Sequence, residues 1–106
     1  MRWPKLSEKA TAELKAEYNQ CCAKCGCADK DILSVDRANN RLGYELGEAG
    51  RNVQILCVVC NCYIKRCLST PVMPPRQPEW DLEQVYKNRD RYREECKNRS
   101  IYDEIV

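Results

Sequence analysis

Histidine is absent from this 106-residue chain, and so is phenylalanine. Without histidine, zinc sites of the Cys2His2 and Cys3His kinds are excluded, as is the most common general base near neutral pH. Long apolar runs are missing too, because none approaches the roughly 20 residues that span a bilayer. We therefore expect a soluble protein with no membrane partner, whose small core contains aliphatic side chains and cysteine.

Net charge is also small, since 18 Lys and Arg against 16 Asp and Glu leave +2. This balance is a weak guide to partners, because nucleic-acid binding depends on basic residues that gather on one face. A domain of this length buries a limited fraction of its surface, so we expect a cross-link, either disulfides or a bound metal ion, to stabilise it in addition to the core.

Nine cysteines are available for that cross-link. Two C-x-x-C pairs, Cys22 with Cys25 and Cys57 with Cys60, offer four thiolates to one tetrahedral zinc ion. The odd number of cysteines, and the lack of a signal-peptide pattern before them, favour metal over disulfides. We predict one structural zinc ion and an intracellular location, cytoplasmic or nuclear.

The sequence assigns no role to the five other cysteines, which are Cys21, Cys27, Cys62, Cys67 and Cys96. Those beside the first pair are interpreted either as buried thiols that behave as small apolar groups or as alternative ligands. A redox or metal-transfer function would need exposed cysteines of low pKa.

The hydrophobic pattern predicts an α+β protein in four consecutive parts: an N-terminal helix at 1–20, a zinc module at 21–68, a proline-rich connector at 69–78, and a C-terminal amphipathic helix with a tail at 79–106. We expect the first helix, capped by Ser7, to pack on the zinc module. Within the module, residues 32–36 and 53–56 are expected as short strands and 61–67 as a helix.

The C-terminal helix is expected to begin near Pro78 or Glu79 and carries charges of alternating sign. Such a run is typical of a solvated face with pairs of opposite charge four residues apart. In the alternative interpretation, the arginines between 89 and 99 lie along a phosphate backbone.

Four motifs follow one another in a recognisable order: Cys22-Ala-Lys-Cys25-Gly26, the strand-end acid Asp36, the loop residue Asn52, and Cys57-Val-Val-Cys60-Asn61. In this order, residues 20–67 resemble the zinc-containing branch of the HNH, or His-Me finger, endonucleases, which includes phage junction resolvases. The resemblance implies a ββα-metal core flanked by the two helices. It also implies a phage or viral origin and, by analogy with the resolvases, a homodimer.

The resemblance further implies a divalent-metal-dependent endonuclease that hydrolyses phosphodiester bonds, with DNA favoured over RNA. Asp36 and Asn61 would offer oxygen ligands to Mg²⁺ or Mn²⁺ at the catalytic site. The family's general base is the His after the acid, and here that position is Arg37, whose pKa above about 12 rules out that role. Cleavage is therefore left open, and we expect an HNH-like nucleic-acid-binding module.

Structural roles also stay open for these residues. Asp36 would cap a turn through the amides of Ala38 or Asn39, and Asn61 would cap the final helix. Arg37 would contact a phosphate or pair with Asp36. The alternative function is a non-enzymatic zinc module that serves as an interaction or assembly subunit of a larger complex.

Overall fold

The computed structural model describes residues 5–39, 42–44, 51–65 and 71–105, with side chains as far as residue 98. Its elements in chain order are α1 (Glu8–Glu17), the 3-10 turn η1 (Lys30–Ile32), β1 (Leu33–Arg37), β2 (Val53–Cys57), the π-helix η3 (Val59–Ile64) and α2 (Leu82–Ile105). The expected α+β class is confirmed. Cys67 lies outside the described residues.

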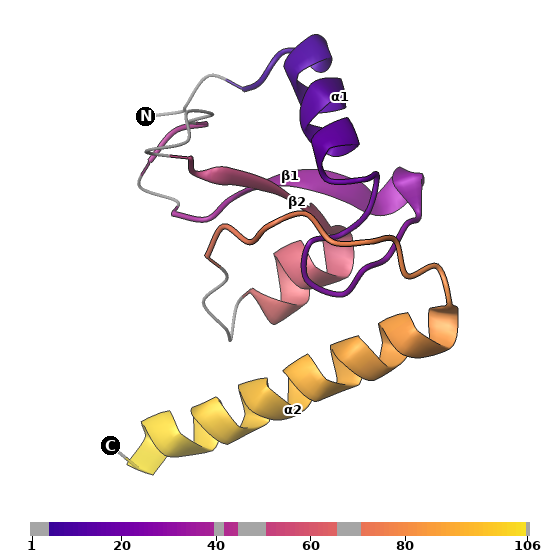
Figure 1. Ribbon diagram of the computed structural model, residues 1–106. Coiled ribbons are helices and arrows are strands. Elements are labelled where there is room, and N and C mark those ends of the chain that lie inside the picture. The colour runs from indigo at the N-terminus through magenta and orange to yellow at the C-terminus, as the bar shows by residue number, and fades with distance from the viewer. Residues whose placement is uncertain (1–4, 40–41, 45–50, 66–70, 106) are drawn as a thin grey trace.

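The two strands form an antiparallel hairpin in which Leu33 lies opposite Cys57 and Arg37 opposite Val53. Every residue of β2 is buried, whereas β1 is only partly buried. The hairpin lies between α1 on one side and η3 with α2 on the other (Figure 1). The largest fully buried aliphatic side chains come from three elements, β2 (Val53, Ile55 and Leu56), η3 (Ile64) and α2 (Val85).

α1 begins where its sequence predicts, directly after Ser7, and ends at Glu17, before the end of the expected range 1–20. Ser7 accepts a hydrogen bond from the amide of Ala10 at 3.1 Å, so the predicted cap is confirmed. Leu14 is buried on the inner face of the helix. Beyond its end, Asn19 and Gln20 take left-handed backbone angles (φ 58° and 56°), which turn the chain toward the first cysteine pair.

The proline-rich connector has no regular secondary structure over residues 71–78, yet polar contacts hold it along β2. The side chain of Gln54 donates to the carbonyl of Pro71 at 3.1 Å and accepts from the amide of Met73 at 3.0 Å. Tyr18 donates its hydroxyl hydrogen to the carbonyl of Met73 at 2.7 Å. The connector therefore occupies a fixed path between the hairpin and α2.

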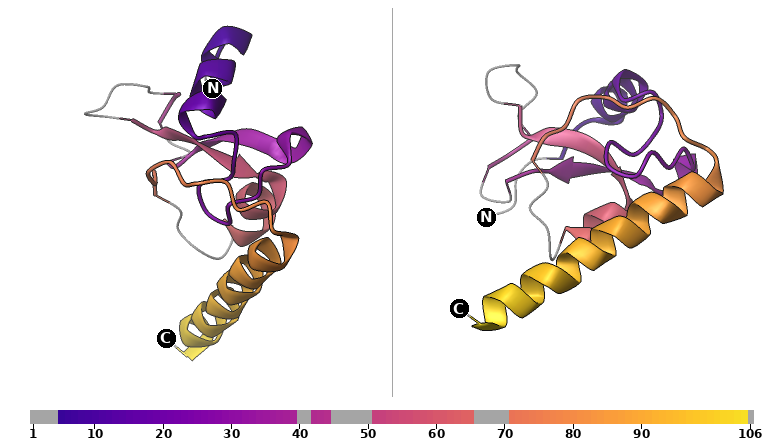
Figure 2. Two further views of the ribbon diagram at one scale, coloured as in Figure 1. Left: turned by 45° about the vertical axis from the view of Figure 1, so that its right-hand side comes forward. Right: turned by 60° about the horizontal axis from the view of Figure 1, so that its bottom comes forward.

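α2 begins at Leu82 rather than near Pro78 or Glu79. The amide of Glu79 is already bonded to the carbonyl of Gly26 at 3.2 Å, which ties this segment to the zinc module before the helix starts. Asp81 then accepts from the amide of Glu83 at 3.0 Å and caps the first turn. Figure 2 shows that α2 passes beneath η3 and that its C-terminal end extends beyond the rest of the chain.

No helix among the described residues has both the length and the apolar character that crossing a membrane requires.

Candidate metal centre

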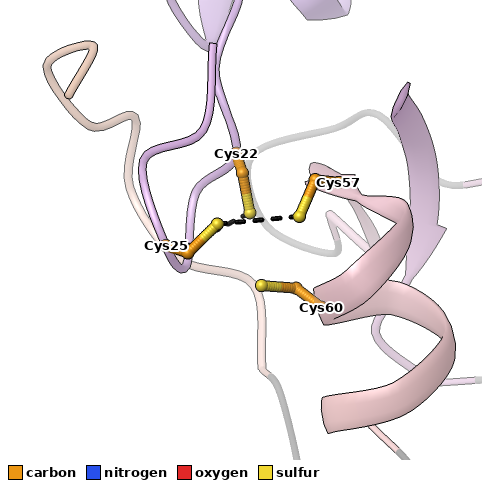
Figure 3. A group of neighbouring side chains, drawn as sticks. All are labelled: Cys22, Cys25, Cys57 and Cys60. Carbon is orange, nitrogen blue, oxygen red and sulfur yellow. Dashed lines mark hydrogen bonds between the residues drawn. The ribbon is translucent and has the colours of Figure 1, made fainter. Parts of the chain in front are cut away.

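Four cysteine side chains point their sulfurs toward one another (Figure 3). Cys22 and Cys25 come from the turn after α1, Cys57 from the end of β2 and Cys60 from η3. All four are buried, and their sulfurs lie within 4.8 Å of one another. A tetrahedral ion with bonds of about 2.3 Å to sulfur requires sulfurs about 3.8 Å apart. The sulfurs of Cys25 and Cys57 are 3.6 Å apart and the cysteines are free thiols, so this four-cysteine group can hold one metal ion such as zinc.

The backbone of the first pair is shaped for metal binding. Gly26 has φ +84°, and its amide closes the turn on the carbonyl of Cys22 at 3.0 Å. The amides of Lys24 and Cys25 both point at the sulfur of Cys22, at 3.4 Å each. Donors aimed at a sulfur favour its thiolate form, which is the form that binds metal.

The hairpin sets the position of the first pair relative to the second. The amide of Ala23 donates to the carbonyl of Ile55 at 2.9 Å, so the turn that carries Cys22 and Cys25 is bonded to β2. Two residues after Ile55, the same strand ends at Cys57. Because of this backbone bond, the two cysteine pairs face each other although about thirty residues separate them.

The four thiols affect one another's pKa values, because their sulfurs lie within 4.8 Å of one another. Hydrogen bonding with Cys25 lowers the pKa of Cys22 to about 7. The pKa of Cys57 is also lowered, first by its hydrogen bond with Cys22, whereas the pKa of Cys60 is raised because its hydrogen bond with Cys22 favours the protonated form. A bound cation would take the place of the thiol protons, since thiolates are the ligands.

α2 contributes to this centre, a role that the sequence did not predict. Asn88 donates its side-chain amide to the carbonyl of Cys25 at 2.8 Å, and Tyr92 donates its hydroxyl hydrogen to the carbonyl of Lys24 at 2.8 Å. The ammonium group of Lys24 also lies 4.5 Å from the centre of the Tyr92 ring. The C-terminal helix is therefore bonded to the turn that supplies half of the candidate ligands.

Arg89 lies on the same face of α2, and its guanidinium nitrogen Nη2 donates to the sulfur of Cys57 at 3.2 Å. Only 8 % of the residue is exposed, so Arg89 lies neither on a solvated face nor along a phosphate backbone, and for this residue both interpretations of the charge run are wrong. Burial acts to lower its pKa, but the hydrogen bond to Cys57 and the charge of the nearby thiols outweigh burial and raise it.

The buried cysteines beside the first pair lie outside the four-cysteine group. Cys21 donates to the carbonyls of Tyr18 at 3.3 Å and Arg76 at 3.1 Å, and burial raises its pKa to about 11. Burial also raises the pKa of Cys27, which packs in the core. Both thiols therefore behave as small buried groups, the first of the two interpretations.

Asp36, the predicted catalytic acid, is 1 % exposed and is held by two side chains. Gln54 donates to one carboxylate oxygen at 3.1 Å, and the ammonium group of Lys65 donates to the other at 2.5 Å. Lys65 also donates to the carbonyl of Arg37 at 2.5 Å. Neither Gln54 nor Lys65 was predicted to contact Asp36; the available signal for Lys65 was its position one helical turn after Asn61.

Asn61, the other predicted oxygen ligand, lies inside η3 and is not its N-cap, which is Val58. Its amide nitrogen donates to the hydroxyl of Ser34 at 3.0 Å. Ser34 and Asp36 are two residues apart on β1 and so lie on the same face of the strand, the face that meets η3. We call Ser34, Asp36, Asn61 and Lys65, the last of which directly follows η3, the β1–η3 seam; the two predicted ligands lie on the same side of β1 within it.

Asn52 takes the turn-capping role that had been an alternative for Asp36. Its side-chain oxygen accepts from the amide of Asn39 at 2.8 Å, and its side-chain nitrogen donates to the carbonyls of Asn39 at 3.0 Å and Gly43 at 2.8 Å. Arg37 donates to the carbonyl of Leu42 at 3.0 Å, next to the bridged loop. The guanidinium carbon of Arg37 lies 5.3 Å from the centre of the Tyr44 ring.

The fold and the site define a small α+β protein built around a four-cysteine group that fits one metal ion. Comparison of the chain with protein-family models, with curated proteins and with solved structures found no match. Membership of the HNH family and a catalytic role for Asp36, Arg37 and Asn61 therefore stay predictions from the order of the motifs.

Proposed function

We propose that this chain is a zinc-stabilised, HNH-like module that binds nucleic acid. The observation that carries the proposal is that Asp36 and Asn61 both belong to the β1–η3 seam, where Asn61 bonds to Ser34 two residues before Asp36 and directly follows the cysteine Cys60. In the proposal, β1, β2 and η3 are the hairpin and helix of a ββα-metal finger, and zinc clamps their ends.

Zinc has a structural task in this proposal. Four buried cysteines complete a tetrahedron, so the ion keeps no open position for water or substrate. The ion would fix η3 against the end of β2, and with it Asn61 against β1. Any chemistry on a phosphodiester would therefore take place at the β1–η3 seam and not at the zinc.

The charges around the seam favour an anionic partner. The ammonium of Lys65 neutralises Asp36, and the guanidinium of Arg37 follows directly on the strand, packed against the Tyr44 ring. This edge therefore carries two cations against one carboxylate. A cation beside an aromatic ring suits a nucleic acid, because phosphate pairs with the cation and a base stacks on the ring.

Binding is tested by fluorescence anisotropy with duplex DNA, single-stranded DNA and RNA at several salt concentrations. The proposal expects binding whose affinity falls steeply with salt, and about tenfold weaker binding for Arg37→Met. Lys9→Met, which removes one positive charge from the exposed face of α1, is the matched control. Absence of binding at low salt for every probe would contradict the proposal and favour the assembly subunit.

The Lys65–Asp36 ion pair favours a second candidate, the non-enzymatic zinc module that acts as an interaction or assembly subunit. An ammonium group already neutralises the carboxylate that Mg²⁺ or Mn²⁺ would need as a ligand. Plasmid nicking with Mg²⁺ or Mn²⁺ tests this candidate from the other side: cleavage that is lost in Asp36→Ala would identify a nuclease and exclude the non-enzymatic module. Binding without cleavage in either metal would identify a nucleic-acid-binding module that does not cut.

A further inference from the structure

Arg89 is a buried cation whose burial needs an explanation. It is 8 % exposed, and no ion pair joins it to a carboxylate in the part of the chain that the structure describes. Its Nε atom is buried with no hydrogen-bond partner among the described residues. A charge in the interior is costly unless an opposite charge lies close to it, and the group that Arg89 touches is the sulfur of Cys57 at 3.2 Å.

The four-cysteine group supplies that opposite charge once it holds a metal. Four thiolates around one Zn²⁺ leave a net charge of −2, and this charge is also costly to bury without a partner of opposite sign. One guanidinium removes half of the excess. It also bonds to the sulfur directly, and a charge-assisted hydrogen bond of this kind is stronger than a neutral one.

We propose that Arg89 is a positioning residue of the metal centre: it offsets half of the negative charge of the metal-bound four-cysteine group and donates a hydrogen bond to the Cys57 sulfur. The packing of α2 against the centre and the affinity for the metal are therefore coupled. The inference rests on the proposed occupancy of this group by zinc. It does not depend on nucleic-acid binding.

The neighbours of Arg89 on α2 bond to the other half of the metal site and so connect the position of the helix to the metal. Asn88 and Tyr92 hold the carbonyls of Cys25 and Lys24, in the turn of the first cysteine pair. Arg89 holds Cys57, in the second pair. One helical face therefore bridges both halves of the site, and a metal that draws the halves together also completes the surface on which α2 sits.

The test uses Arg89→Met, which keeps the length of the side chain and removes its charge and its donors. In the full-length protein loaded with Co²⁺, the thiolate-to-cobalt charge-transfer band should move to lower energy, because the Cys57 sulfur loses a hydrogen bond and becomes a stronger donor. Competition with a chromophoric chelator should show zinc held about 10- to 100-fold more weakly. Arg89→Lys, which keeps the charge, should recover most of the affinity.

Arg93→Met is the matched control, because Arg93 is exposed one turn further along the same helix. It should leave the cobalt band and the zinc affinity unchanged. An Arg89→Met protein whose band and affinity equal those of Arg93→Met would overturn the inference. If Arg89→Met does not fold, Arg89→Lys decides: a stable cobalt complex with the band of the unaltered protein supports the role of the charge, and loss of the complex contradicts it.

A different result is expected if the four-cysteine group does not bind zinc at all. If the unaltered protein takes up neither Co²⁺ nor Zn²⁺, the metal assignment is wrong. If it takes up both and Arg89→Met does so equally well, only the role of Arg89 is wrong.

Discussion

The four-cysteine group and the β1–η3 seam are neighbouring polar sites that share η3, and they differ in what completes them. In the first, four ligands of one kind converge, and the nearby donors and the Arg89 guanidinium all favour thiolates. In the second, the chain supplies its own cation, because Lys65 already neutralises Asp36. The cysteine group therefore needs a metal cation to balance its thiolates, whereas the ion pair of Asp36 and Lys65 already balances the charge within the seam.

The largest expected effect comes from breaking the four-cysteine group. Replacing Cys57 by Ser, or removing zinc with a strong chelator, should abolish the cooperative thermal transition, because binding energy of about 10 kcal/mol or more is folding energy in such sites. Circular dichroism and calorimetry measure this. Cys62→Ser is the control, since Cys62 is exposed and should cost no more than about 0.5 kcal/mol. An unchanged transition after verified zinc removal would contradict the account.

Breaking the seam should cost less. Lys65→Met leaves the buried Asp36 carboxylate without its cation and should lower the free energy of unfolding by about 3 kcal/mol, measured by urea denaturation. Mn²⁺ should then raise the stability of this variant more than that of the unaltered protein, if the seam can hold a divalent ion. Lys87→Met, which breaks an exposed pair with Glu83, is the control and should change stability little.

Gly26→Ala probes the turn beside the cysteine group without touching a ligand. A side chain at φ +84° is strained, and the added Cβ would lie 3.0 Å from the Cβ of Glu79, so we expect a loss of about 2 kcal/mol. Zinc should be held more weakly as well, because the amides that point at Cys22 would shift. Equal stability and equal zinc affinity would show that the turn does not need its glycine.

The smallest expected effect is that of Asn61→Ala. It removes one hydrogen bond, to Ser34, and should cost about 1 kcal/mol in denaturant unfolding. Zinc affinity should stay the same, because Asn61 belongs to the seam and not to the cysteine group. A large loss of zinc would mean that the two sites do not act separately.

Local spacing made the cysteine group and the strands predictable. Two residues between cysteines place both thiols on one turn, whatever the rest of the fold does, and Ser7 caps a helix through its own neighbours. The roles of Lys65 and Arg89 depend on partners about thirty residues away in the chain, Asp36 and Cys57. No local pattern encodes such a pairing.

A signal for Arg89 was nevertheless present in the sequence. Val85, Arg89, Tyr92 and Cys96 follow a spacing of three or four residues, and all four are buried. A charged residue within an apolar stripe indicates a buried partner of opposite charge. Because many exposed charged residues surround Arg89 in the sequence of α2, its buried position is hard to recognise from the sequence.

X-ray absorption at the zinc edge, on protein purified without added chelator, tests the central claim most directly. The account predicts one zinc ion per chain with four sulfur neighbours at about 2.3 Å. Nitrogen or oxygen in the first coordination shell, or a metal-free protein in which Cys22, Cys25, Cys57 and Cys60 form disulfides, would contradict it.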